Sequence, residues 1–229
     1  MRTLGLIGGL SAESTVVYYQ QLNRLVRERL GGLHSARLVL WSVDFAPVAE
    51  LQARDDWAAT GRMLADAARR LEGAGAQALL ICANTMHINA AEVAAAVQVP
   101  LIHIADATAA ALGQLGVRRP LFLATRFTME KPFYRDRLAE LGFETLIPDQ
   151  DARDRLHRII YDELCQGVVE PNSRSEVLGM IEAGRRAGAD SVVFGCTEIG
   201  LLLSTAEAGL PAIDTTEAHA RAAIDFALG

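Results

Sequence analysis

The chain contains the same short segment twice, at residues 73–84 and 186–197. The copies align without a gap, as Gly-Ala-Gly-Ala-Gln-Ala-Leu-Leu-Ile-Cys-Ala-Asn and Arg-Ala-Gly-Ala-Asp-Ser-Val-Val-Phe-Gly-Cys-Thr. Each copy is typical of a helix end, a glycine turn, a short apolar strand and a polar residue pair at the strand's end. All doubly wound sheets share parts of this pattern, but the gapless match favours a true internal duplication.

The two copies differ where the strand ends. The second copy carries a thiol there, Cys196, whereas the matching residue of the first copy is Ala83 and a cysteine lies one position earlier, at Cys82. A duplicated fold whose strand ends face each other forms a two-sided site. One side of such a site lacks its reactive group here.

Apolar runs of strand length alternate with amphipathic helical stretches, which predicts βαβ units and parallel sheets. The expected strands are 3–7, 36–43, 78–82, 101–104, 120–124, 144–146, 191–194 and 212–213. The expected helices are 11–30, 57–73, 89–97, 105–115, 129–141, 151–166, 173–187 and 216–228.

The predicted fold class is α/β, with two pseudo-symmetric domains that each hold a mainly parallel sheet flanked by helices. We expect a first domain of residues 1–98 plus 207–229 and a second of residues 99–206, with the active site between them. No Gly-, Ser- or Pro-rich linker separates the halves.

The charge, hydrophobicity and cysteine content of the chain argue against several classes of binding partner and cellular location. With 229 residues, a net charge of −6 and no basic cluster, the chain is a poor candidate for binding nucleic acid or anionic membranes. It has no apolar run long enough to span a bilayer and no leader pattern. Three widely spaced cysteines form neither a disulfide framework nor a zinc site, so we expect a cytoplasmic protein.

Ligands of open parallel sheets bind at the carboxyl ends of the strands, so four strand ends are candidates. The first is a glycine turn, Gly8-Gly9-Leu10, followed by Ser11 as the expected N-cap of a helix. The second is Ala83-Asn84-Thr85, followed by His87. Both segments could bind a ligand or only form a turn and a helix cap, and His87 could be a site residue or a packing residue.

The third strand end offers two hydroxyls and a guanidinium, Thr125, Thr128 and Arg126, that suit a carboxylate. The fourth is Cys196-Thr197-Glu198. We expect helix-start amides to favour the Cys196 thiolate and Glu198 to exchange a proton with it.

No cofactor is indicated. Lys131 is the only lysine of the chain, so a pyridoxal Schiff base would depend on that single residue. The five histidines show no metal-ligand spacing, no flavin or nicotinamide motif is present, and Cys165 is expected in the core. The chemistry that remains possible is a cysteine thiol acting on an α-proton without a cofactor.

Four segments together resemble the aspartate/glutamate racemase family, and most of all its bacterial L-aspartate/glutamate-specific branch. They are Gly-Leu-Ile-Gly-Gly-Leu-Ser-Ala-Glu-Ser-Thr (5–15), Ala-Asn-Thr-Met-His (83–87), Ala-Thr-Arg-Phe-Thr-Met-Glu (124–130) and Gly-Cys-Thr-Glu-Ile (195–199). The resemblance covers essentially the whole chain. It implies a pyridoxal-independent racemase that acts on a small acidic amino acid, forms a homodimer, and uses two cysteines on opposite faces of the α-carbon.

The resemblance assigns roles residue by residue. Cys196 matches the second family cysteine, and Thr197 and Glu198 match the pair that follows it. The implied substrate-binding positions are Leu10, Gln52, Asn84, Thr85, Thr125, Thr128 and Thr197.

Ala83 departs from the family pattern, which has Cys, or Thr in the L-specific branch, directly before Asn-Thr. Alanine has no transferable proton. Because side chains alternate along a strand, Cys82 should point into the sheet packing unless a bulge turns it inward.

The sequence leaves three functions open: an impaired or one-sided racemase, a one-cysteine enzyme that decarboxylates or isomerises diacids, and a non-catalytic binder of an acidic amino acid. It also leaves open whether aspartate or glutamate is the substrate, and whether Arg54, Arg126 or Lys131 meets the side-chain carboxylate.

Overall fold

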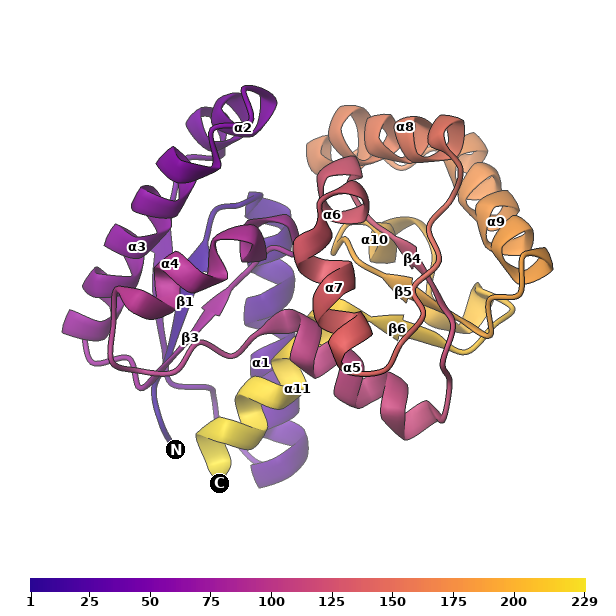
Figure 1. Ribbon diagram of the computed structural model, residues 1–229. Helices are drawn as coiled ribbons and strands as arrows, with labels where there is room; N and C mark the ends of the chain where they lie inside the picture. The colour runs from indigo at the N-terminus through magenta and orange to yellow at the C-terminus, as the bar shows by residue number, and fades with distance from the viewer. The chain divides into compact units, whose positions relative to one another are not determined.

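The computed structural model describes residues 1–229 and divides into two compact units (Figure 1). Unit 1 comprises Met1–Ile104 and His219–Gly229, and unit 2 comprises Ala105–Ala218. No helix is long and apolar enough to cross a membrane.

Unit 1 is built around a parallel sheet of order β2-β1-β3, which an isolated bridge between Leu79 and Leu101 extends beyond β3. Its strands are β1 (Leu4–Gly8), β2 (Leu38–Ser42) and β3 (Ala78–Ile81). Its helices are α1 (Ala12–Leu30), α2 (Phe45–Ala53), α3 (Trp57–Gly73), η1 (Thr85–Asn89), α4 (Ala90–Ala95) and most of α11 (Thr215–Leu228).

Both faces of this sheet are covered, because alternate residues of β1 and β3 point into two separate cores. One core joins Leu6 and Leu80 to α1 and α11, and the other joins Ile7 and Leu79 to α3 and α4. Figure 1 shows α1 and α11 on one side of β1 and β3, with α3 and α4 on the other. The predicted strands that form β1 and β3 are therefore buried, whereas β2 is half-buried at its start and exposed at its end.

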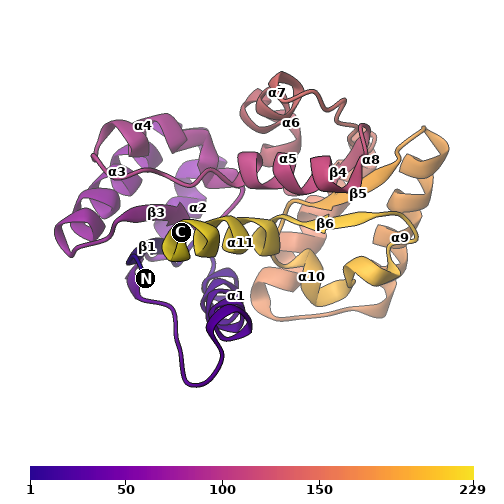
Figure 2. The same ribbon diagram turned by 90° about the horizontal axis from the view of Figure 1, so that it is seen from below.

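Unit 2 repeats this plan with a parallel sheet of order β4-β5-β6, extended by a bridge between Leu121 and Leu146. Its strands are β4 (Pro120–Leu123), β5 (Ser191–Phe194) and β6 (Ala212–Asp214). Its helices are α5 (Ile104–Leu115), α6 (Arg126–Glu130), α7 (Pro132–Glu140), α8 (Gln150–Arg158), η2 (Ile159–Glu163), η3 (Leu164–Gln166), α9 (Pro171–Arg186), α10 (Ile199–Leu202) and η4 (Thr205–Glu207). Figure 2 shows β5 and β6 lying between α5 and α10.

The two copies of the repeated segment have the same backbone conformation. Gly75 and Gly188 have φ values of 91° and 93°, a region that glycine enters without steric cost. The hydrogen bonds after each glycine also correspond: Cys82 N donates to Ile7 O at 2.9 Å, and Gly195 N donates to Leu123 O at 2.7 Å. The helix–turn–strand pattern predicted for both segments is confirmed.

The unit boundaries differ from the expected ones for a reason visible in the pairing. Residues 99–104 stay with unit 1, because Leu79 N donates to Pro100 O at 2.9 Å and Ile102 N donates to Leu79 O at 2.9 Å. Residues 207–218 stay with unit 2, because β6 pairs with β5.

Several expected elements are shorter or divided. The strands expected at 101–104 and 144–146 reduce to the single bridges at Leu101 and Leu146. The helix expected at 129–141 is divided before Pro132, which lacks an N–H and begins α7. The helix expected at 151–166 changes to π-helix at Ile159, and α2 was not expected at all.

Candidate active site

In unit 1, the loop after β3 starts at Ala83, a half-buried residue that packs against the α3 core. Asn84 and Thr85 follow and are buried at the start of η1. The carbonyl oxygen of Ala83 lies 2.9 Å from His87 Nδ1. Ala83, which occupies the expected position of the first thiol, is therefore held in place through its backbone carbonyl.

Cys82 does not replace the missing thiol. Its side chain is fully buried in the same core as Ala78 and Leu80, as the alternation of side chains predicted. This burial raises the pKa of the Cys82 thiol far above its usual value. The structure shows no bulge that turns Cys82 toward the loop, since β3 pairs regularly with β1 up to Ile81.

The glycine turn after β1 is built around Gly9, which has a φ of 76° and at which a Cβ would collide with the Val43 backbone. Ser11 caps α1 as predicted, since its Oγ accepts from Ser14 N at 3.1 Å. Ser14 Oγ in turn donates to Cys82 O at 2.9 Å. The first two strand ends are thereby joined by hydrogen bonds.

Leu10 and Gln52 both lie beside the loop after β3. Leu10 is buried in the same core as Met86. Gln52, on α2, is also buried, and its Nε2 lies 3.1 Å from Met86 Sδ. The structure thus brings the unit 1 candidates together.

In unit 2, Thr125 and Thr128 are hydrogen-bonded to each other at the start of α6. Thr125 Oγ1 accepts from Thr128 N at 3.4 Å and lies 3.0 Å from Thr128 Oγ1, and both side chains are buried. Thr125 is therefore a helix cap, whatever else its hydroxyl binds.

Cys196 and Glu198 form a hydrogen-bonded pair directly after β5. The thiol donates to Glu198 Oε2 at 2.9 Å, and Cys196 is half-buried while Glu198 is buried. Gly195 precedes the pair, and a Cβ there would collide with the Phe122 ring. The absence of a side chain at Gly195 therefore allows the backbone after β5 to pack directly against Phe122 of β4.

Burial and the adjacent Glu198 carboxylate raise the pKa of the Cys196 thiol well above its usual value. The backbone N–H of Glu198 acts in the opposite direction and lowers this pKa, but its effect is smaller. The two larger effects oppose the thiolate expected from the sequence and favour a protonated Cys196 beside Glu198.

Thr197 is held by the start of α11. Its Oγ1 lies 2.9 Å from Thr216 Oγ1, and Thr215 Oγ1 donates to Phe194 O at 2.9 Å. Asp214 Oδ1 accepts from Thr216 N at 2.7 Å, and burial raises the pKa of the Asp214 carboxyl. Asp214 and Thr216 were not among the residues predicted from the sequence, although Asp-Thr-Thr directly follows a predicted strand.

The structure also adds two aromatic residues to the unit 2 candidates. Tyr161 lies in the π-helix η2, and burial together with the electrostatic influence of Cys196 raises the pKa of its hydroxyl. The centroids of the Tyr161 and His157 rings are 4.6 Å apart, and His157 Nδ1 lies 3.4 Å from Arg126 N. No sequence signal for a π-helix was available at 159–163.

Two basic candidates for binding a substrate carboxylate lie in exposed ion pairs. Arg126 pairs with Asp154 at 3.3 Å, and Arg54 pairs with Glu50 at 3.8 Å, with both pairs substantially exposed. Exposed pairs of this kind are weak, so either guanidinium can exchange its partner for a ligand at little cost.

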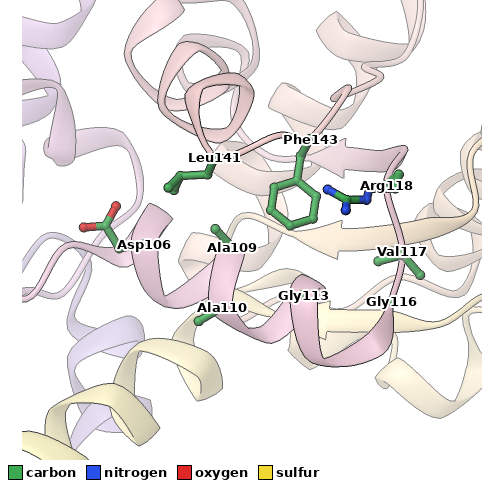
Figure 3. A pocket seen from close by; sticks show the side chains of 9 residues that line it. All are labelled: Asp106, Ala109, Ala110, Gly113, Gly116, Val117, Arg118, Leu141 and Phe143. Carbon is green, nitrogen blue, oxygen red and sulfur yellow. The ribbon is translucent and has the colours of Figure 1, made fainter.

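A pocket of about 460 Å³ in unit 2 lies away from these residues (Figure 3). The ring of Phe143 and the guanidinium of Arg118 lie at one end of it, and Asp106 lies near the start of α5 at the other. Residues 116–118 precede β4, so the pocket is at the amino end of the sheet rather than at the carboxyl end. No group of three or more His, Cys, Asp or Glu side chains is arranged to hold a metal ion.

Comparison with known proteins identifies the family. The family model described as Asp/Glu/hydantoin racemase matches residues 7–223. The chain belongs to this family. Its racemase fold extends over both units.

Three relatives illustrate the likeness. A Yersinia pestis protein provisionally named an Asp/Glu racemase is 46% identical, with a TM-score of 0.92 and 100% of both chains covered. An aspartate racemase homologue of Pyrococcus horikoshii OT3 is 31% identical, with a TM-score of 0.87 and 100% of both chains covered. The broad specificity amino-acid racemase RacX of Bacillus subtilis is 21% identical over 166 residues, which are 71% of this chain and 70% of RacX.

Proposed function

We propose that this member of the racemase family acts on aspartate or glutamate without a cofactor, with Cys196 as the acid/base group. The observation that supports this most is the Cys196 Sγ to Glu198 Oε2 hydrogen bond of 2.9 Å at the carboxyl end of β5. A thiol beside a carboxylate can either give or take a proton.

The proposed reaction begins with the S–H proton passing from Cys196 to Glu198 Oε2. The thiolate then removes the α-proton, which leaves a carbanion on the substrate and restores the thiol. Water protonates the opposite face of the carbanion, and the resulting hydroxide takes the proton from Glu198. All four proton transfers sum to inversion of the α-carbon.

Neutral donors are proposed to stabilise the carbanion and the substrate carboxylates. The five side chains are all buried and lie just after strands, in the connecting loop or in the short helix that follows it: Asn84, Thr85, Thr125, Thr128 and Thr197. Fixed donors in a buried site lower the energy of developing negative charge without reorganising. Leu10 and Gln52 are proposed to complete the binding surface.

Ala83 leaves the water step without a protein group. A positioned acid/base group contributes about 10²- to 10⁴-fold, so its absence on one face should make turnover slow or biased in direction. The raised pKa of Cys196 adds to this bias, because a resting thiol is a better donor than acceptor.

Chiral chromatography tests the proposal. Both enantiomers of aspartate and of glutamate are incubated with the protein and no added cofactor, beside Cys196→Ala. Conversion that disappears in Cys196→Ala supports the proposal, and conversion that survives in this variant contradicts it.

The absence of a thiol at Ala83 is also compatible with a second function, decarboxylation of a diacid. A one-cysteine decarboxylase of a diacid needs only one donor: the C–C bond to the carboxylate breaks, CO₂ leaves, and Cys196 S–H protonates the carbanion. Release of CO₂ from malonate derivatives without racemisation supports this function. Tight binding of L-aspartate in calorimetry with neither reaction indicates a binding protein.

A further inference from the structure

Three histidines and a tyrosine of unit 1 form an aromatic cluster outside the proposed reaction, in which His103 is half-buried and the other three residues are buried. The centroid of the His87 ring lies 4.7 Å from that of His103 and 5.6 Å from that of His219. The centroids of the His219 and Tyr18 rings are also 5.6 Å apart. His87 is 2% exposed and His219 is 0% exposed. Buried imidazoles need partners for both ring nitrogens.

The partners of His87 fix its tautomer. Its Nδ1 lies 2.9 Å from Ala83 O, which can only accept, so Nδ1 carries the proton. Its Nε2 accepts from Ile104 N at 3.2 Å, so Nε2 carries none. The ring is neutral and spans from the loop after β3 to the backbone of Ile104.

The partners of His219 fix the opposite tautomer. Its Nε2 lies 2.7 Å from Ile102 O and must donate to it. Its Nδ1 lies 2.7 Å from Tyr18 Oη and accepts from this hydroxyl. The ring is again neutral, and it joins α11 and α1 to the same short segment, 102–104.

This segment is where the chain leaves unit 1. The chain passes into unit 2 after Ile104 and returns to unit 1 at His219. The two imidazoles therefore bond the backbone at the first crossing, and His219 is itself the first residue after the second crossing.

We propose that His87 and His219 are positioning residues, two neutral imidazoles of opposite tautomer. His87 ties the Ala83-Asn84-Thr85 segment to the start of α5, and His219 ties α1 to the backbone of Ile102 just before it. His87 acts on the reaction through the carbonyl of Ala83 and not by touching substrate. The expected effect on turnover rests on the proposed function. The hydrogen bonds that form this tie between backbone segments do not depend on it.

Nuclear magnetic resonance of the intact protein tests the tie directly. Long-range ¹H–¹⁵N spectra should show His87 protonated at Nδ1 and His219 protonated at Nε2, with His87→Gln identifying the His87 signal. The exposed His34 provides a reference ring in the same spectra. Protonation of His87 at Nε2, or an equal mixture of tautomers, overturns the proposal whatever the activity.

Amide exchange and kinetics test the consequence. Glutamine can donate and accept as this imidazole does, whereas alanine can do neither. The Ile104 N–H should exchange slowly in the native protein and in His87→Gln, and at least about tenfold faster in His87→Ala. Unchanged exchange in His87→Ala overturns the proposal.

For turnover, we expect His87→Ala to lower kcat about tenfold or more and to change KM by less than about threefold, because a misplacement near 1 Å can cost about a hundredfold. His87→Gln should recover most of this loss, and His34→Ala should show none. Equal losses in His87→Gln and His87→Ala overturn the positioning role. Absence of racemisation in the native protein, with the tautomers as assigned, overturns the proposed function and leaves the tie supported.

Discussion

At the scale of single residues, the proton on Cys196 decides what this site can do. The thiol donates to Glu198 Oε2, and burial together with this carboxylate raises the pKa of the thiol. A resting thiol needs Glu198 before it can act as a base, so the two side chains form one functional unit.

Replacing Glu198 by glutamine should therefore have two opposite effects. Glu198→Gln removes the negative charge that raises the pKa of Cys196, so alkylation of this thiol should reach its plateau at lower pH. Exchange of the α-proton should fall about a hundredfold or more, because no base remains to deprotonate the thiol. Rates of iodoacetamide labelling against pH measure the first effect, with Cys196→Ala identifying the signal. Faster labelling together with undiminished exchange would contradict the coupling.

Position 83 should limit the two-sided reaction. Ala83→Cys supplies a thiol on the loop after β3 and should raise the racemisation rate at least about tenfold, and Ala83→Thr should raise it less because a hydroxyl is a weaker acid. Ala83→Val has the shape of threonine without the hydroxyl and is the matched control. Chiral chromatography measures all three, and equal rates in Ala83→Thr and Ala83→Val would show that the hydroxyl at position 83 takes no part.

At the scale of elements, the sequence predicts those parts of the site whose local signals are strong. The glycines at 75 and 188 mark both turns, and the residues after β3 and β5 are where the alternation places them. The bonds that Thr216 and His87 make across long sequence separations had no local signal. Neither did the π-helix η2 that contains Tyr161, whose hydroxyl pKa is raised by burial and by Cys196.

The end of β5 should tolerate no side chain at Gly195. Gly195→Ala places a Cβ against the Phe122 ring and the Ala124 Cβ, and overpacking of this kind costs about 1–3 kcal/mol. Gly179→Ala in α9 has open space around it and should stabilise the helix by up to about 1 kcal/mol. Urea denaturation of both variants gives the two free energies of unfolding. A Gly195→Ala variant as stable as the native protein would refute the close approach of β5 to β4.

At the scale of the whole molecule, the buried His219 should make stability depend on pH. Burial lowers the pKa of His219 from 6.5 to about 4, and the groups that face it are Tyr18, His87 and His103. Between these pH values the unfolded chain binds the proton and the folded chain does not, so stability falls as pH falls from 6.5 to 4. The loss from this group is about 3 kcal/mol.

The free energy of unfolding measured between pH 7 and 4 tests this dependence. His219→Gln keeps a donor and an acceptor but does not titrate, so its stability should fall less steeply over this range. Parallel slopes in the two proteins would contradict the neutral, buried state of His219.

The central claim is that Cys196, activated by Glu198, exchanges the α-proton of an acidic amino acid on one face of the carbon. Incubation of each enantiomer of aspartate and glutamate in deuterated buffer measures this most directly, with α-proton loss followed by magnetic resonance. We predict that one enantiomer loses its α-proton at least about tenfold faster than the other, and that Cys196→Ala abolishes this exchange. Equal exchange of both enantiomers, or exchange that persists in Cys196→Ala, would contradict the claim.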